Sequence, residues 1–188
     1  MLTAQEIGVP LRFRRAALKD FAELAQLPGW NDHGLYIAGD AGVGKSRLAA
    51  ALLLDAVRCG SCKDYFPGSG LVVLSHRWIS APTLLMELRG TMDSRGESER
   101  DVIGRYCSPR LLVLDDLGAE RESDWTQQAI YMLLSSRVDA MRPTIVTSNL
   151  PLAEIDKRDP RLASRLGGMT YFKLNGVDRR LQETRQEG

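Results

Sequence analysis

Residues 39–46 read Gly-Asp-Ala-Gly-Val-Gly-Lys-Ser, and this octapeptide constrains the fold more than any other part of the chain. An apolar run at 35–38 leads into it, and apolar residues at helical spacing follow it as far as Gly60. Glycine lets such a loop curl so that its N–H groups point at phosphate oxygens, and the positive end of the next helix strengthens that attraction. The segment is therefore a phosphate-binding loop at a strand-to-helix junction.

The loop predicts ATP or ADP with Mg²⁺ as the bound cofactor. Lys45 can reach the β- and γ-phosphates, and the Ser46 hydroxyl can ligate Mg²⁺. The predicted nucleotide-binding residues are Gly39, Asp40, Ala41, Gly42, Val43, Gly44, Lys45, Ser46 and Arg47.

Two further polar motifs follow buried strands. Four apolar residues at 111–114 precede Asp115 and Asp116, and an apolar strand at 144–147 runs into Asn149. Ligands of parallel sheets bind at the carboxyl ends of the strands. We expect Asp115 to hold Mg²⁺, Asp116 to orient or deprotonate the attacking water, and the Asn149 amide to contact the γ-phosphate or that water.

Strands and helices alternate along the chain, which predicts an α/β fold with a central parallel sheet and helices on both faces. The expected strands are 35–38, 71–74, 111–114 and 144–147, with a loop at 60–70. Helices are expected after the phosphate-binding loop, from Pro82, and from Ser123 or Asp124 as far as a stripe that includes Met141. We divide the chain into an N-terminal extension (1–34), an ATPase domain (35–181) and a polar tail (182–188).

The composition limits the binding partners and the cellular location that we expect. The net charge is +1, so nucleic-acid binding would depend on a local basic face. The chain contains no apolar run of roughly 20 residues and its first residues lack the pattern of a signal peptide, so we expect a cytoplasmic location without membrane contact.

Cys59 and Cys62 form a Cys-x-x-Cys pair. A zinc site would need two more ligands, and Cys107, His76 and His33 do not repeat the paired spacing. We therefore expect two free thiols in a turn rather than a metal site.

From about residue 7 to 181 the chain resembles the AAA+ ATPases, and more narrowly the DnaC/DnaI helicase loaders and the IstB transposition helpers. The resemblance rests on Gly8-Val9-Pro10, the phosphate-binding loop, Leu114-Asp115-Asp116-Leu117-Gly118-Ala119-Glu120, Pro143-Thr144 with Thr147-Ser148-Asn149, Arg161-Leu162-Ala163-Ser164-Arg165-Leu166, and Gly176-Val177-Asp178-Arg179-Arg180. It implies a P-loop NTPase of the AAA+ type with no separate helical lid.

The resemblance also implies roles for single residues. Asn149 is similar to sensor 1, and Arg165 to an arginine finger donated to the γ-phosphate of a neighbouring subunit, with Arg161 as the second choice. Arg180 matches the sensor-2 arginine, with Arg179 as the alternative. Residues 8–11 would lie near the adenine.

Asp116 departs from the Glu that most AAA+ proteins carry there, and its shorter arm sets the carboxylate back. A misplacement of about 1 Å can cost roughly 10²-fold in rate, so we expect slow hydrolysis that serves a switch. Loaders usually carry an N-terminal segment that grips the helicase. Residues 1–34 do that job, or the partner differs, or this chain is part of a longer protein.

The leading hypothesis is an ATP-dependent loader that assembles into a homo-oligomer and binds a hexameric DnaB-like replicative helicase and single-stranded DNA. The predicted DNA contacts are Arg77, Trp78, Arg89, Arg95, Arg100 and Arg105. The alternatives are an IstB-like helper that binds duplex DNA and a transposase, a small-molecule kinase, and a nucleotide-gated scaffold that never hydrolyses ATP.

Overall fold

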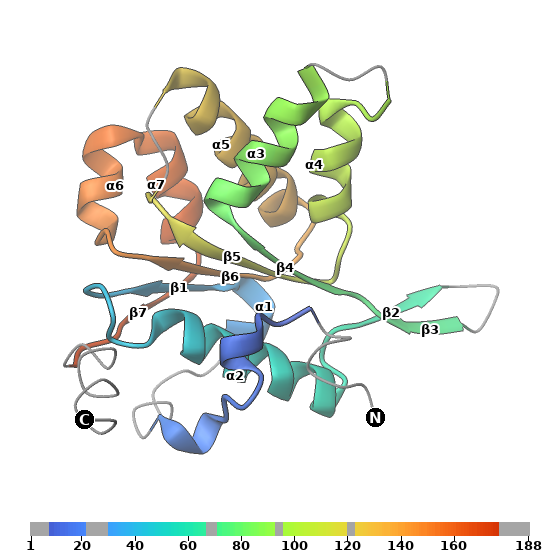
Figure 1. Ribbon diagram of the computed structural model, residues 1–188, viewed down its shortest axis with the longest axis vertical. Helices are drawn as coiled ribbons and strands as arrows, with labels where there is room; N and C mark the ends of the chain where they lie inside the picture. Colours follow the sequence, from blue (N-terminus) through green and yellow to red (C-terminus); the bar gives the residue numbers. More distant parts are fainter. Residues whose placement is uncertain (1–7, 22–29, 67–70, 93–95, 120–122, 177–188) are drawn as a thin grey trace.

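A five-stranded parallel sheet forms the centre of the protein in the computed structural model, which describes residues 8–21, 30–66, 71–92, 96–119 and 123–176 (Figure 1). The strand order is β4-β5-β6-β1-β7, and every neighbouring pair is parallel. The strands are β1 (Leu35–Ala38), β4 (His76–Ser80), β5 (Leu111–Leu117), β6 (Thr144–Ser148) and β7 (Thr170–Lys173). The predicted α/β class with a central parallel sheet is confirmed.

Helices cover both faces of this sheet (Figure 1). One face carries α1 (Trp30–His33) and α2 (Lys45–Cys59). The other carries α3 (Ala81–Met92), α4 (Glu99–Cys107), α5 (Asp124–Asp139), α6 (Leu152–Arg158) and α7 (Pro160–Gly167). Side chains of β5 alternate between the two cores, with Leu112 and Leu114 on the α3–α7 side and Leu111 and Val113 on the α2 side. A strand buried on both faces reads as a continuous apolar run, which is why the sequence identified it.

The two edge strands of the sheet were not predicted. Residues 71–74 do form a strand, β3 (Leu71–Leu74), but it pairs antiparallel with β2 (Lys63–Phe66) in a separate two-stranded sheet. The predicted loop at 60–70 therefore contains a strand, and the central sheet uses β4 instead. Both β4 and β7 are edge strands with alternating burial, so they lack the apolar run that marks an interior strand.

Helix α5 begins where the sequence indicates, because the Ser123 hydroxyl accepts from the Thr126 N–H as an N-cap. It ends at Asp139, earlier than the predicted stripe. Met141 lies beyond the helix in a left-handed conformation (φ 52°) and is 62% exposed, so its place on that stripe is wrong.

The described part of the predicted N-terminal extension packs against α2. Val9, Ala16 and Phe21 are buried in the α2 core, and the Arg47 Nη2 atom lies 2.9 Å from the Asp20 carboxylate. Residues 8–21 are thus joined to the first helix after the phosphate-binding loop by apolar contacts and an ion pair. Residues 22–29 of the predicted extension, and the tail at 182–188, lie outside the described residues.

Arg137 of α5 is fully buried and ties together the segments that precede β5 and β6. Its Nη1 donates to the carbonyls of Tyr106, Cys107 and Pro109 at 2.8–3.1 Å, and its Nη2 donates to that of Pro143 at 2.8 Å. Burial lowers the pKa of Arg137 to about 9, which still leaves the guanidinium charged at neutral pH. The end of α4 and the starts of two strands therefore share one cation.

In the described part of the chain, every helix is too short or too polar to cross a membrane.

Replacing Arg137 with Ala should lower the free energy of unfolding by about 3 kcal/mol or more, because several buried carbonyls lose their donor at once. Arg137→Lys should be intermediate, since an ammonium has three donors and the guanidinium five. Urea denaturation measures both. Lys157→Ala is the control, because Lys157 is a helical cation whose side chain is 69% exposed, and it should change stability by less than about 0.5 kcal/mol. Equal stability of Arg137→Ala and the unsubstituted protein would contradict this role.

Candidate active site

The phosphate-binding loop occupies residues 39–44, between β1 and α2. A Cβ at Gly39 would lie 2.3 Å from the carbonyl oxygen of Leu174, whose N–H donates to Ala38. Gly44, at the start of α2, has φ 106°, a conformation that residues with a Cβ rarely adopt. The loop follows this path because glycine stands at both positions.

Lys45 is 6% exposed, and its ammonium group is held at the mouth of the loop. The Nζ atom donates to the carbonyls of Gly39 and Asp40 at 2.9 and 2.8 Å, and to the Asn149 Oδ1 atom at 2.6 Å. Asn149 comes directly after β6, which pairs with β1. The residues predicted as phosphate-binding lysine and sensor amide are therefore in direct contact.

Thr147 of β6 positions both predicted carboxylate residues of β5. Its Oγ1 atom donates to Asp115 Oδ1 at 2.6 Å and accepts from the backbone N–H of Asp116 at 3.0 Å. The β5–β6 register breaks between Leu114 and Leu117, the stretch that holds the two aspartates. The sequence motif Thr147-Ser148-Asn149 includes Thr147, but no role was predicted for its side chain. Its position two residues before Asn149, on the same strand end, was the available signal.

Asp116 has a backbone φ of 62°, in the left-handed region that a non-glycine residue seldom occupies. Such conformations persist where surrounding contacts enforce them, and they gather at functional sites. Here the Thr147 hydroxyl holds the Asp116 N–H, and the Ala119 N–H donates to the Asp116 carbonyl at 3.3 Å. The bend gives the Asp116 side chain a direction that a regular strand would not.

Asp115 is 4% exposed. Burial raises the pKa of its carboxyl group; hydrogen bonds from Thr147 and Ser46 oppose this, and the nearby Asp116 charge adds to it. Burial therefore disfavours the ionised form of Asp115, although the charge of Arg12 acts in the opposite direction. Ser46 stands within hydrogen-bond reach, so the structure brings together one carboxylate and one hydroxyl oxygen.

This pair fits Mg²⁺, which prefers oxygen ligands and takes only one or two from the protein when phosphates and waters complete its shell. No group of three or more His, Cys, Asp or Glu side chains able to hold a metal occurs among the described residues. That finding includes Cys59 and Cys62, which are not disulfide-bonded.

Arg165 lies at the opposite end of the sheet from Lys45. It lines a cavity with residues that precede β1, β6 and β7, namely Asp32, His33, Arg142, Pro143, Gly168 and Met169. Lys45 follows the carboxyl end of β1, whereas this cavity lies at the amino ends. The structure therefore does not bring Arg165 to the phosphate-binding loop of its own chain.

Arg161, the second choice for the finger, stands in the first turn of α7 with a side chain that is 61% exposed. Its Nε atom lies 3.5 Å from the Asp159 carboxylate. The two predicted sensor-2 arginines, Arg179 and Arg180, lie outside the described residues.

The predicted DNA contacts do not form one surface. Successive side chains of a strand point to opposite faces, so Arg77 and Trp78 of β4 face different sides of the sheet. The Trp78 ring packs on the α2 side against Phe13, with ring centroids 6.2 Å apart. The two side chains therefore point away from each other across the sheet. Arg100 is exposed, and Arg95 lies outside the described residues.

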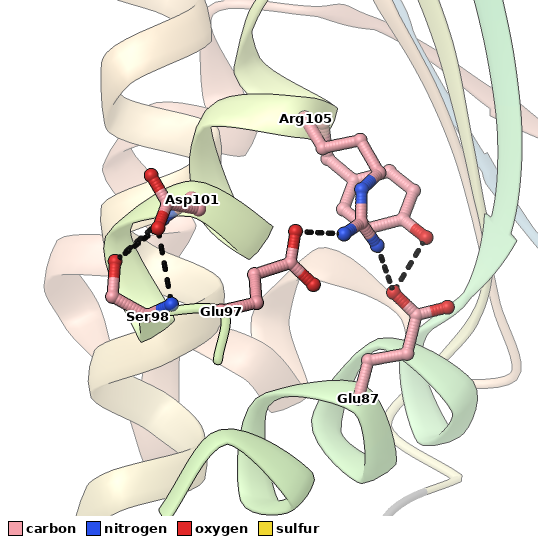
Figure 2. A network of polar contacts seen from close by, with 6 residues as sticks. Glu87, Glu97, Ser98, Asp101 and Arg105 are labelled. Atoms are coloured by element: carbon pink, nitrogen blue, oxygen red, sulfur yellow. Dashed lines mark hydrogen bonds and ion pairs between the residues drawn. The ribbon is translucent and has the colours of Figure 1, made fainter. Parts of the chain in front are cut away.

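The charge of Arg105 is balanced by two carboxylates. Figure 2 shows Glu87 of α3 and Glu97 both contacting its guanidinium, the former at 3.0 Å. Arg89 lies over the ring of Trp125, with its Cζ atom 5.3 Å from the centroid. These arginines hold α3, α4 and α5 together, which reduces the positive charge they could offer to a phosphate backbone.

The sequence model of the IstB-like ATP binding proteins matches residues 12–167. The chain belongs to this family. It is 26% identical over 161 residues to the chromosomal replication initiator protein DnaA of Gluconobacter oxydans, covering 86% of this chain and 30% of that protein. It is 29% identical over 136 residues to a protein described as ATP-binding in an insertion sequence of Mycobacterium tuberculosis, covering 71% and 47%.

It is also 28% identical over 162 residues to the replicative helicase loader DnaI of Bacillus subtilis, covering 78% of this chain and 47% of that protein. The chain thus spans less than half the length of these curated relatives. Among solved structures, DnaI matches with a TM-score of 0.67 at 23% identity, covering 90% of this chain and 93% of that one. The DnaC helicase loader matches with a TM-score of 0.64 at 22% identity, covering 88% and 100%.

These matches confirm the predicted membership of the AAA+ proteins related to DnaC, DnaI and IstB, and the P-loop fold that goes with it. Nucleotide binding is a property of the family.

Asp115→Asn should leave the nucleotide-free protein at least as stable as the unsubstituted one, while removing its response to Mg·ATP. When folding raises the pKa of a carboxyl group, the folded protein loses stability as the pH rises through the pKa that the group has in the unfolded chain. A neutral amide at the same position avoids that loss. Each kcal/mol gained would raise the unfolding midpoint by about 2–4 °C.

Thermal unfolding with and without Mg·ATP measures both effects, because a ligand that binds only the folded state raises the midpoint. Removing Mg²⁺ with EDTA should reduce the shift in the unsubstituted protein and change nothing in the variant. A destabilised variant that keeps the full Mg·ATP shift would rule out this account of Asp115.

Thr147→Val should lower kcat for ATP hydrolysis about tenfold with little change in KM, because the carboxylates would be less well placed. It should also cost about 1–2 kcal/mol of stability, since a buried N–H loses its acceptor. Thr147→Ser, which keeps the hydroxyl, should restore most of the rate. Ser148→Ala is the matched control, because it removes a buried β6 hydroxyl that bonds Leu117 and Leu150 rather than the aspartates. If Thr147→Val, Thr147→Ser and Ser148→Ala hydrolysed ATP at equal rates, the positioning role of Thr147 would be excluded.

Proposed function

We propose that this protein is a Mg²⁺-dependent ATPase that acts as an ATP-controlled loader of a replicative helicase. The observation that carries the proposal is that Lys45 bonds Asn149, while Thr147 bonds the Asp115 carboxylate and the Asp116 backbone N–H, all at the carboxyl ends of the strands. The kinase alternative would need an acceptor pocket beside the phosphates, and the matching family is described as ATP binding proteins rather than kinases.

In the proposed reaction each residue acts close to its position in the structure. Lys45 would exchange its carbonyl contacts for the β- and γ-phosphates, and Ser46 and Asp115 would hold the metal. Mg²⁺, when bound, would neutralise charge on the transferred phosphoryl group. Asp116 would orient the attacking water and take its proton. Asn149, already bonded to Lys45, would contact the γ-phosphate.

Hydrolysis is proposed to be slow. Asp116 has a shorter arm than glutamate, and its backbone stores strain of about 1–3 kcal/mol. Both features suit a protein that holds one state until a partner triggers the reaction. Arg165 would supply that trigger from a neighbouring subunit, since its own chain keeps it away from Lys45. An arginine finger can be worth about 10³–10⁵ in rate.

The partner is inferred from the relatives. DnaI is named a replicative helicase loader, and this chain shares 28% of aligned residues with it. We propose a hexameric DnaB-like helicase and single-stranded DNA as partners. Arg77, Arg89 and Arg100 are the exposed residues among the described predicted DNA contacts.

The second candidate is a transposition helper that binds duplex DNA and a transposase. The match to the IstB-like family, and to an insertion-sequence protein of Mycobacterium tuberculosis, favours it. It would use the same ATPase residues, so only the preferred DNA and partner distinguish the two functions.

The loader hypothesis predicts ATP-dependent capture of the replicative helicase from the same organism. The unsubstituted protein should retain it with a non-hydrolysable ATP analogue and release it with ADP. Asp116→Asn should retain it with ATP itself, because its hydrolysis should fall about 10²-fold or more while ATP still binds. Lys45→Ala should not retain it at all.

Phosphate release and DNA binding are measured on the same proteins. Phosphate should pass to water, with a rate per subunit that rises with protein concentration. No helicase capture, together with a preference for duplex over single-stranded DNA, would favour the transposition helper. Capture without any phosphate release in single-turnover assays would identify a nucleotide-gated scaffold.

A further inference from the structure

Tyr36 of β1 is a fully buried residue with a polar end. Its side chain lies in the core on the α3–α7 side of the sheet. Its hydroxyl donates to the carbonyl of Leu150 at 2.6 Å, which joins two residues that are 114 positions apart in the chain. Burial raises the pKa of Tyr36 to about 12, so the phenol keeps its proton and remains a donor at neutral pH.

The acceptor lies beside the proposed sensor. Leu150 directly follows Asn149 in the short turn between β6 and α6. The Asn149 Oδ1 atom accepts from the Lys45 Nζ atom at 2.6 Å. On the other side of Leu150 stands Pro151, the N-cap of α6, whose ring restricts φ (here −68°). The Tyr36 hydroxyl therefore holds the turn one residue after the sensor amide.

The same residue belongs to the strand that leads into the phosphate-binding loop. Gly39, the first residue of the loop, comes three positions after Tyr36. In the sheet Tyr36 stands opposite Val146 of β6 and Tyr171 of β7. The rings of the two tyrosines have centroids 5.9 Å apart. Tyr36 thus connects the strand that carries the loop to the turn that carries the sensor.

This connection matters because the two ends of the site already touch. The Lys45 ammonium group belongs to the loop, and the Asn149 amide belongs to the turn. A turn that shifted relative to β1 would move the amide relative to the lysine, and so relative to any phosphate that the lysine binds. A misplacement of about 1 Å can cost roughly 10²-fold in rate.

We propose that Tyr36 is a positioning residue for ATP hydrolysis. Its hydroxyl fixes the turn at 149–151, so that the Asn149 amide stays within reach of the γ-phosphate bound by Lys45. Tyr36 acts through Leu150 and Asn149 and is not itself a catalytic residue. The proposal rests on the proposed ATPase function and on the sensor role proposed for Asn149.

Tyr36→Phe tests the proposal, because it removes the hydroxyl and keeps the buried ring. It should lower kcat for ATP hydrolysis about tenfold, since the amide is less well placed in the transition state. KM for ATP should change by less than about threefold, because the contacts of the loop with the nucleotide remain. Tyr106→Phe is the matched control and should leave kcat unchanged, since it removes a hydroxyl that bonds Glu87 of α3 instead.

The decisive measurement is the same change in an Asn149→Ala background. Asn149→Ala should itself lower kcat. With no amide left to place, Tyr36→Phe should then cost no further rate, so the double variant should match Asn149→Ala. A loss that came only from a weakened fold would appear in both backgrounds. Urea denaturation of each variant measures the folded fraction under the assay conditions.

Each other result would overturn the proposal in a distinct way. Equal losses in the two backgrounds would show that Tyr36 acts on the fold and not through Asn149. An unchanged kcat in Tyr36→Phe, beside a clear loss in Asn149→Ala, would refute the role of Tyr36 and leave the ATPase proposal intact. Full activity of Asn149→Ala would refute the sensor role, and no hydrolysis by the unsubstituted protein would refute the ATPase proposal; the role of Tyr36 would fall with either.

Discussion

The hydrogen bonds of the Thr147 hydroxyl are the contact on which the candidate site depends. In a parallel sheet with the order β5-β6-β1, the ends of three strands lie side by side, but register alone does not aim their side chains. Thr147 lies on the central strand of the three and does aim them. Its hydroxyl donates to the Asp115 carboxylate and accepts from the backbone N–H of Asp116. Asn149, two residues on, reaches Lys45 across the other neighbour. The Asp115 carboxylate, the Asp116 backbone and the Lys45 ammonium group are thereby all bonded to β6 or to the residue that follows it.

The sequence predicted the interior of the sheet and the phosphate-binding loop because both are local. A buried strand needs apolar residues in a row, and the loop needs glycines at set positions, so β1, β5, β6 and α2 could be located. The edge strands β4 and β7 escaped because neither contains a run of buried apolar residues. Contacts between distant segments escaped too, since no spacing shows that the Tyr36 hydroxyl meets Leu150. The burial of Arg137 could have been predicted from the sequence but was not. Arg137 follows Ile130 and Leu134 on the apolar stripe of α5, where a charged side chain needs a buried partner.

Two buried charged residues illustrate how fold and function treat charge differently. Arg137 donates to four carbonyls and to the Thr144 hydroxyl, so its burial is compensated within the chain. Asp115 accepts a hydrogen bond from the Thr147 hydroxyl, and burial still raises its pKa. A structural charge is satisfied by the protein alone, whereas a carboxylate whose ionised form is disfavoured by burial is suited to a divalent cation. The strained φ of Asp116 is a second cost at the same place.

The distance between Lys45 and Arg165 links chemistry to assembly. A strand of four residues rises about 13 Å, and the two side chains belong to opposite ends of the sheet. An arginine at the amino ends does not complete a phosphate site at the carboxyl ends of the same chain, so the proposed finger would have to come from a second subunit. A single subunit would then bind ATP without hydrolysing it efficiently, and hydrolysis would report that a neighbour had docked. The exposed Arg165–Asp139 pair, which is weak in water, would give way at little cost when that neighbour arrived.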